Sequence, residues 1–330
     1  MPRVRPIALA VRNLGRRRLR TSAAVTAVAI GVATLLLMRG VTAGVQRINT
    51  SLLVEGVLGA LQVHRAGWSE SAEFSALTLD FEDSAELRAA LLKVDGVRAV
   101  APRILFAAAL GGGDAEAQYF LATAFEPAVE REVTRLRVEW LSRWPESTDE
   151  PKVVVSADLA ASLPRGELGL LANDRDEALN GENVELGGTA KSGLPGNRRY
   201  GFVPLGLARR LLRMEGRATE YAIAVRDGAD LLRIKRELSA ALGPGFEVHT
   251  WDELSPFLKE IERGQNAFGV IMSGILLLVV LLGVASTMQM NVMDRAREVG
   301  TLLALGARRA TVARLFVVEG TLMGAVGAGL

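Results

Sequence analysis

The charged residues with the most informative spacing lie in one short segment, residues 291–314, which holds five arginines between two apolar runs. Val299, Leu302 and Gly306 follow one another at the spacing of a single helix face, beside the carboxylate of Glu298. A helix of this kind can bind another protein through its apolar face and be oriented by its charges. An ordinary solvated loop has the same composition, so the spacing predicts a protein contact without identifying the partner.

The side chains that carry most catalytic and metal chemistry are scarce in this chain. It has no cysteine and two histidines, His64 and His249, which excludes thiolate metal sites and disfavours a histidine-rich one. No stretch has the form GxxxxGK[ST], so the triple glycine at 111–113 is not a phosphate-binding loop. Carboxylates are plentiful, but none stands at a catalytic spacing from a histidine or serine. We expect no enzyme activity, cofactor or metal in this chain.

Two uncharged runs position the 291–314 segment relative to a membrane. Residues 21–38 and 268–290 contain 18 and 23 residues, or about 27 and 35 Å as helices, against a hydrocarbon core of about 30 Å. The hydrophobic content of 49% fits membrane spans. Seven arginines precede the first run and five follow the second, which places both flanks in the cytoplasm. A cleavable signal peptide is the alternative for the first run.

The expected fold is an integral membrane α-helical protein with a large α+β extracytoplasmic domain. The GxxxG pairs Gly40/Gly44 and Gly320/Gly324 allow close helix packing. The last apolar run is too short for a full crossing, so we expect a truncated chain. The expected parts are a basic amphipathic cytoplasmic-face helix (1–20), a first transmembrane helix (21–38), a stalk helix (39–55), the extracytoplasmic domain (56–255), a second stalk helix (256–267), a second transmembrane helix (268–290), a cytoplasmic helix and loop (291–314) and an incomplete third transmembrane helix (315–330).

Inside the domain, short strand patterns alternate with helix patterns, and a second lobe is expected to be inserted into the first. Asp83 or Ser84 is expected to cap one helix and Asp252 another, whereas Gly306 is expected to end the cytoplasmic helix in a left-handed cap. Pro195-Gly196 marks a loop. The patterns predict strands at 59–67, 97–110, 117–125, 152–155, 183–189 and 220–226, and helices at 83–94, 156–163, 204–214 and 229–242.

The cytoplasmic segment also carries a family resemblance. The stretch DRAREVGTLLALGARRATVARLFVVEG (294–320) is similar to the R-x-R-E-(I/V)-G-x-L-x-A-(L/I)-G-A pattern of the MacB/FtsX/Lol-type permeases of ABC transporters, the mechanotransmission (type VII) group. AVRNLGRRRLRT (10–21) and LKVDGVRAVAPR (92–103) resemble the same family. Family members have four spans, whereas this chain stops within the third.

The resemblance implies a permease subunit with a MacB-like two-lobed periplasmic domain in a bacterial inner membrane, working in lipoprotein release or efflux. A separate ABC ATPase would bind ATP and Mg, and a second permease protomer would complete a homo- or heterodimer. A periplasmic adaptor or a lipoprotein is a further implied partner; nucleic acid is not. The residues implied to contact the ATPase are Arg295, Arg297, Glu298, Val299, Gly300, Leu302, Leu303, Leu305, Gly306 and Ala307.

Two other functions remain open at this point. A two-span sensor would bind a ligand with its outer domain and signal through the short inner segment, but no signalling domain is evident in the sequence. A membrane-anchored periplasmic enzyme would need a catalytic constellation that the sequence does not display.

Overall fold

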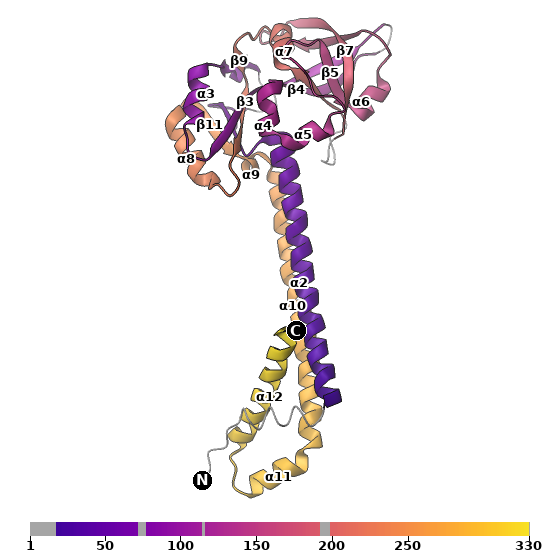
Figure 1. The fold of residues 1–330 in the computed structure, drawn as a ribbon, viewed down its shortest axis with the longest axis vertical. Coiled ribbons are helices and arrows are strands. Elements are labelled where there is room, and N and C mark those ends of the chain that lie inside the picture. The colour runs from indigo at the N-terminus through magenta and orange to yellow at the C-terminus, as the bar shows by residue number, and fades with distance from the viewer. Residues whose placement is uncertain (1–17, 72–76, 114–115, 192–198, 330) are drawn as a thin grey trace. The chain divides into compact units, whose positions relative to one another are not determined.

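The computed structural model describes residues 18–71, 77–113, 116–191 and 199–329. Residues 47–259 form one compact unit, and the described residues on either side of that range form another. Each unit is described by itself (Figure 1). The predicted amphipathic helix at 1–20 lies almost wholly outside the described residues, and so does the loop at Pro195-Gly196.

The membrane unit is helical. Its helices are α2 (Arg18–Leu53), α10 (Pro256–Asp294), α11 (Ala296–Ala304) and α12 (Arg309–Gly329). Within the described chain, the stretches Val25–Leu58 and Lys259–Asp294 are long and apolar enough to cross a membrane. The mean hydropathy of their most apolar 18 residues is 1.8 and 2.7, respectively. Each predicted pair of transmembrane and stalk helices is one continuous helix. Helix α12 begins at Arg309, before the start predicted at 315, because the residues from Arg309 to Arg314 contain no helix breaker.

Two of these helices make close contact at an unpredicted glycine. A Cβ at Gly31 would overlap the side chain of Val280, so α2 and α10 approach each other there. Around Gly40, Gly44 and Gly324 a Cβ would meet no described atom within 4 Å, and at Gly320 it would lie 3.8 Å from Met288. Packing through Gly40, Gly44 and Gly324 therefore stays a prediction.

The extracytoplasmic unit is built on a mixed sheet with the order β11-β1-β10-β3-β4-β8-β5-β7-β6. A small second sheet pairs β2 with β9. The strands of both sheets are β1 (Leu61–Arg65), β2 (Phe81–Glu82), β3 (Val97–Gly111), β4 (Gln118–Phe125), β5 (Lys152–Ser156), β6 (Leu168–Asn173), β7 (Leu179–Ala190), β8 (Tyr200–Pro204), β9 (Arg217–Ala218), β10 (Glu220–Val225) and β11 (Phe246–Thr250).

The long strand β3 joins two lobes. Its residues Val97–Arg103 pair with β10, whereas Arg103–Leu110 pair with β4 and the last three residues pair with β6. The β6 pairing closes β3-β4-β8-β5-β7-β6 into a ring, while β11-β1-β10-β3 remains an open sheet. Pro102 pairs with β10 on one side and with no strand on the other. Its missing N–H is tolerated there, as it is on an edge strand.

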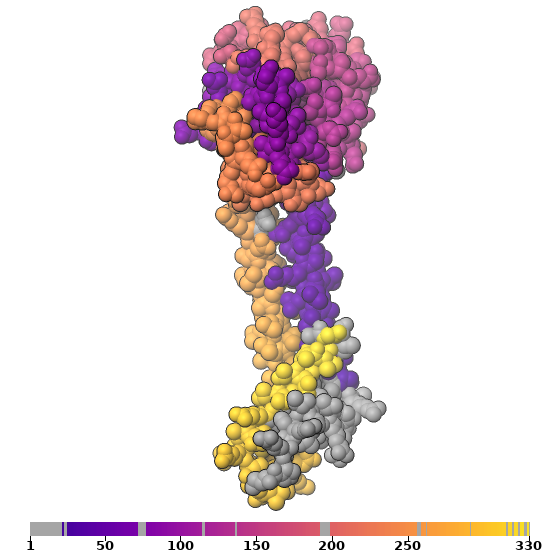
Figure 2. Space-filling model, turned by 60° about the vertical axis from the view of Figure 1, so that its left-hand side comes forward, coloured from indigo at the N-terminus to yellow at the C-terminus, as the bar shows by residue number. Residues whose placement is uncertain are grey.

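Each lobe has its own hydrophobic core. The first is centred on Leu61, Tyr221 and Ile234, and the second on Phe106, Leu170 and Leu207. In Figure 2 the violet and orange segments, far apart in sequence, lie together on one side of this unit, and the magenta segment lies on the other. The residues between β3 and β9 are thus inserted into a lobe made from both ends of the domain, as predicted.

Most local predictions in this domain are confirmed. The short helices and turns are η1 (Val54–Leu58), η2 (Leu77–Leu79), α3 (Ala85–Leu92), α4 (Pro127–Val133), α5 (Arg135–Trp140), α6 (Ala157–Ser162), α7 (Leu205–Leu212), α8 (Leu231–Leu242) and α9 (Trp251–Leu254). Ser84 caps α3, and its Oγ accepts the N–H of Leu87 at 3.1 Å.

The cap predicted at Asp252 is wrong. Thr250 is the N-cap of α9, and the carboxylate of Glu253 accepts the Thr250 N–H at 3.0 Å in a capping box. Asp252 lies inside the helix and accepts a bond from Lys259 at 2.9 Å. The prediction failed because threonine and aspartate, two residues apart, are both favourable N-cap residues.

Candidate functional site

The segment predicted to lie in the cytoplasm and to bind a partner, residues 291–314, contains the short helix α11 between the end of α10 and the start of α12. Its end is set by Gly306, which has a φ of 90°. The Gly306 N–H donates to the carbonyl oxygen of Leu303 and the Ala307 N–H to that of Leu302, both at 3.0 Å. This is a Schellman motif, in which a residue without a Cβ takes the left-handed conformation. The predicted left-handed cap is confirmed.

Helix α11 and its cap bring the predicted contact residues together in an exposed position. No residue of α11 is buried. Exposed fractions are 43% for Leu302, 38% for Leu303 and 80% for Leu305, so apolar side chains are open within this chain. Arg297 and Glu298 are also exposed, and a Cβ at Gly300 would meet nothing within 4 Å. Of the other predicted residues, Arg295, Val299 and Ala307 are half-buried.

A second site, which the sequence did not predict, lies at the C-terminal end of α2. There the helix widens into the π-helical turn η1, in which the N–H of Gly59 donates to the carbonyl oxygen of Val54, five residues earlier, at 2.9 Å. We call residues Val54–Leu58 the stalk turn. Its carbonyl oxygens at Gly56, Val57 and Leu58 lie at a helix C-terminus, which carries partial negative charge and needs donors.

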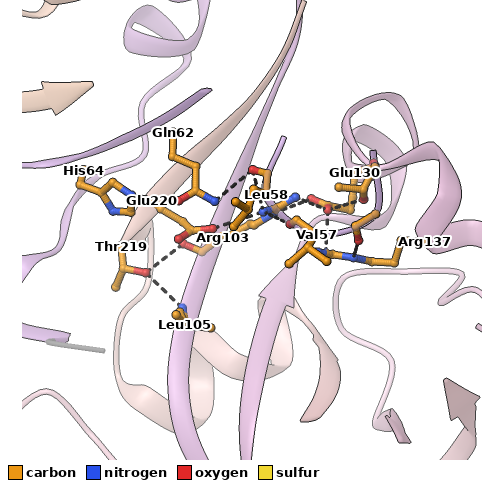
Figure 3. A network of polar contacts seen from close by, with 12 residues as sticks. Val57, Leu58, Gln62, His64, Arg103, Leu105, Glu130, Arg137, Thr219 and Glu220 are labelled. Atoms are coloured by element: carbon orange, nitrogen blue, oxygen red, sulfur yellow. Dashed lines mark hydrogen bonds and ion pairs between the residues drawn. The ribbon is translucent and has the colours of Figure 1, made fainter. Parts of the chain in front are cut away.

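Two buried arginines donate to those carbonyl groups (Figure 3). Arg137 of α5 donates from Nε to the oxygen of Gly56 at 3.0 Å and from Nη2 to that of Val57 at 2.8 Å. Arg103 of β3 donates from Nη1 to the oxygen of Val57 at 2.9 Å. Both arginine side chains are at most 2% exposed. The end of the stalk turn is therefore held by fully desolvated cations.

Two carboxylates hold the arginines in turn. Glu130 of α4 is fully buried and accepts from Arg103 Nη2 at 2.7 Å, from Arg137 Nη1 at 2.8 Å and from Thr134 Oγ1 at 2.7 Å. Glu220 of β10 contacts Arg103 Nη1 at a longer 3.4 Å. We call Arg103, Glu130, Arg137 and Glu220 the junction network. It contains two cations and two acids drawn from both lobes.

The pKa shifts in the junction network reflect how well each group is paired. Burial disfavours the Glu130 carboxylate, but the facing charges of Arg103 and Arg137 outweigh it and lower its pKa. Burial raises the pKa of Glu220, because its single long contact with Arg103 compensates less. Burial also lowers the pKa of Arg137 to about 10, which leaves it charged at neutral pH. Glu130 is thus the central anion.

Separate ion pairs tie the two lobes together away from the stalk turn. Asp83, from the first lobe, accepts a bond from Arg209 of α7, in the inserted lobe, at 2.6 Å and from the hydroxyl of Tyr221 at 2.8 Å. Arg88 also pairs with Asp83, and it reaches Glu126 at 2.8 Å. These contacts hold the lobes against each other.

The two histidines lie on neighbouring strands, His64 on β1 and His249 on β11. His64 is 1% exposed and stacks on Trp68 with ring centroids 3.9 Å apart. Burial lowers its pKa to about 3, so the ring is neutral. His249 lies 3.2 Å from the carboxylate of Glu247. Among the described residues no cluster of three or more His, Asp or Glu side chains forms that would hold a metal ion.

Comparison with known proteins assigns the chain to a family. A model of the MacB-like periplasmic core domain matches residues 21–241, about two thirds of the chain, and a model of the FtsX-like permease C-terminal domain matches residues 270–330. The first match contains the junction network, and the second contains α11.

Individual relatives agree with this assignment. The macrolide export ATP-binding/permease protein MacB of Nitrobacter winogradskyi is 24% identical over 93% of this chain and 48% of its own length. An uncharacterized ABC transporter permease of Methanocaldococcus jannaschii is 29% identical over 36% of this chain and 31% of its own. The chain thus spans less than half the length of each.

Among solved structures, the periplasmic region of MacB from Actinobacillus actinomycetemcomitans matches 60% of this chain and 92% of its own, with 12% identity and a TM-score of 0.41. The family models cover the extracytoplasmic lobes and the segment that carries α11, and the two long apolar helices account for membrane spans. The chain therefore belongs to the ABC transporter permeases of the MacB/FtsX type, membrane proteins with a large extracytoplasmic α+β domain.

Proposed function

We propose that this chain transmits the motion of an ABC ATPase from the cytoplasm across the membrane to its extracytoplasmic domain. The observation that carries the proposal is α11, a short helix between the apolar helices α10 and α12 with exposed leucines and charges. An exposed apolar surface rimmed by charges is the usual mark of a protein contact. The family's permease role supplies the class of partner.

The partner in this proposal is an ATPase subunit that binds ATP and Mg, together with a second permease protomer. Arg295, Arg297 and Glu298 would orient the ATPase, and Leu302, Leu303 and Leu305 would fill an apolar groove on it. The name of the Nitrobacter relative joins ATP binding and permease in one protein. We propose that the ATPase of this system is a separate subunit.

The work of the moving domain would be lipoprotein release or efflux in an inner membrane, with an adaptor or lipoprotein as the extracytoplasmic partner. In this mechanism the substrate does not pass between α2 and α10. The family match favours this role over the two-span sensor and the anchored enzyme, because it accounts for both the outer domain and α11.

The test is ATP hydrolysis by the complex that co-purifies with the full-length chain from native membranes, reconstituted in nanodiscs. Glu298→Lys reverses an exposed charge, and Gly300→Trp adds a bulky ring where the surrounding space is open, so neither change strains α11 itself. We expect each to lower ATP hydrolysis at least about tenfold through loss of the α11 contact.

The matched control is Glu70→Lys, the same charge reversal on an exposed turn of the extracytoplasmic domain. It should leave ATP hydrolysis unchanged. ATP hydrolysis that is unaffected in both α11 variants, or a chain that co-purifies with no ATPase, would contradict the proposed function.

A further inference from the structure

Among the described residues, side chains of α5 join the stalk turn directly to the inserted lobe. After the stalk turn the chain continues directly into β1, and the Ala60 N–H donates to the carbonyl oxygen of Ile223, so the backbone connects it to the first lobe. The inserted lobe is reached through α5, which follows α4 in sequence and lies against the stalk turn. These side-chain contacts are the direct route from the stalk turn to the inserted lobe, whereas the backbone route runs through the first lobe and strand β3, which both lobes share.

Two residues of α5 make this contact. Arg137 donates to the carbonyl oxygens of Gly56 and Val57. One helical turn later, Trp140 covers Gly56 so closely that a Cβ there would overlap its ring. The ring of Trp140 and the guanidinium of Arg137 thus hold one residue of the stalk turn from two directions.

Arg137 is itself held in place. Glu130 fixes Nη1 at 2.8 Å, and the guanidinium lies 4.8 Å from the ring centroid of Phe202 on β8. A planar guanidinium with its donors committed to two carbonyl oxygens and a carboxylate has little freedom to rotate. Arg103 donates to the same turn, but it lies on β3, which both lobes share.

We propose that Arg137 is a positioning residue that makes the end of helix α2 move together with the inserted lobe. The proposal rests on the proposed function, because it says how motion that arrives along α2 enters the extracytoplasmic domain. Ion pairs such as Asp83–Arg209 hold the lobes to each other, so a pull on α5 displaces the whole domain. Without the Arg137 guanidinium, the stalk turn pivots while the lobes stay together.

The experiment measures distance distributions between pairs of spin labels in the full-length chain in nanodiscs. The chain contains no cysteine, so each introduced label is unique. Arg47→Cys places a label on the exposed side of α2, Ala161→Cys on the inserted lobe and Ala240→Cys on the first lobe. The 47/161 and 47/240 distances report the orientation of the stalk turn relative to each lobe. The 161/240 distance reports the position of the two lobes relative to each other.

In Arg137→Gln we expect both distributions from position 47 to broaden about twofold, because the stalk turn samples more orientations. The 161/240 distribution should stay as narrow as in the wild type. Arg135→Gln, on the exposed side of the same helix, is the matched control and should change none of the three. Arg137→Lys keeps the charge beside Glu130 without the planar fork and should give intermediate widths.

If Arg137→Gln yields no folded protein, Arg137→Lys decides the question by the same criterion. Unchanged distributions from position 47 would overturn the proposal, and so would broadening of the 161/240 pair to the same extent, which would indicate general loosening. No ATPase is present in this measurement, so its outcome is independent of the test of the proposed function.

Discussion

Two polar regions at the ends of the long apolar helices are built in opposite ways. Helix α11, which follows α10, leaves its leucines and charges exposed and ends in the Schellman cap at Gly306. The junction network, which ends α2, buries every charge and pairs it with another side chain or a carbonyl group. An exposed contact suits a partner that binds and reorients, whereas a buried one suits a permanent joint.

The difference also predicts how each region responds to amino-acid substitutions. Removing one member of a buried charged set leaves the others unpaired in a desolvated place, which costs far more than removing an exposed charge. We therefore expect variants of the junction network to act through the domain's stability and motion. Variants of α11 should act through partner binding with little effect on the fold.

The largest effect is expected for Glu130→Gln. The substitution removes the anion that faces both Arg103 and Arg137, and the free energy of unfolding should fall by about 3–5 kcal/mol. Thermal unfolding of the full-length chain in detergent, followed by tryptophan fluorescence, should show a Tm lower by roughly 6–20 °C.

Glu220→Gln is the matched control, because it removes a buried carboxylate that makes one long contact with Arg103. Its cost should stay below about 1 kcal/mol, since Arg103 keeps its bonds to Glu130. Equal losses in the two variants would show that Glu130 is not the central anion of the junction network.

A smaller effect is expected from pH. Because the pKa of Glu130 is lowered on folding, its stabilisation is complete above the ordinary carboxyl value of 4.5 and is lost as pH falls through the lowered value. The stability difference between wild type and Glu130→Gln should therefore shrink in acid.

Glu220 should behave with the opposite sign. Its pKa is raised on folding, so protonation stabilises the folded wild type as pH falls through the raised value. The free energy of unfolding of the wild type, measured relative to that of Glu220→Gln, should therefore rise as pH falls from neutral through the raised pKa. A constant difference from pH 7 to about pH 4 would contradict the assigned shift.

The same contrast separates what the sequence could predict from what it could not. The end of α11 at Gly306 and the cap at Ser84 were predictable, because each depends on residues within one or two turns. The junction network joins Arg103 to Glu130 and Glu220 across 27 and 117 residues, so no local pattern contains it. Its one signal was Arg103 itself, an arginine inside the apolar run that became β3.

The ring of strands in the inserted lobe was hidden for a similar reason. Strands β3 and β4 were predicted because they are neighbours along the chain with alternating or continuous apolar residues. The closing contact pairs Ala109 with Leu171, and strand periodicity does not specify such a distant partner. The packing of α2 on α10 at Gly31 likewise depends on Val280, far away in sequence, and the GxxxG pairs drew attention elsewhere.

The most direct test of the central claim is amide hydrogen exchange of the extracytoplasmic domain in the ATPase complex, with and without ATP trapped by vanadate. In the wild type, trapping should change exchange in residues 54–62 and in α5. In Glu298→Lys it should change neither, because the motion does not enter the chain. In Arg137→Gln, ATP hydrolysis should stay within about twofold of wild type, while the change in α5 disappears. Exchange in α5 that responds to ATP equally in all three proteins would contradict transmission from α11 through the junction network.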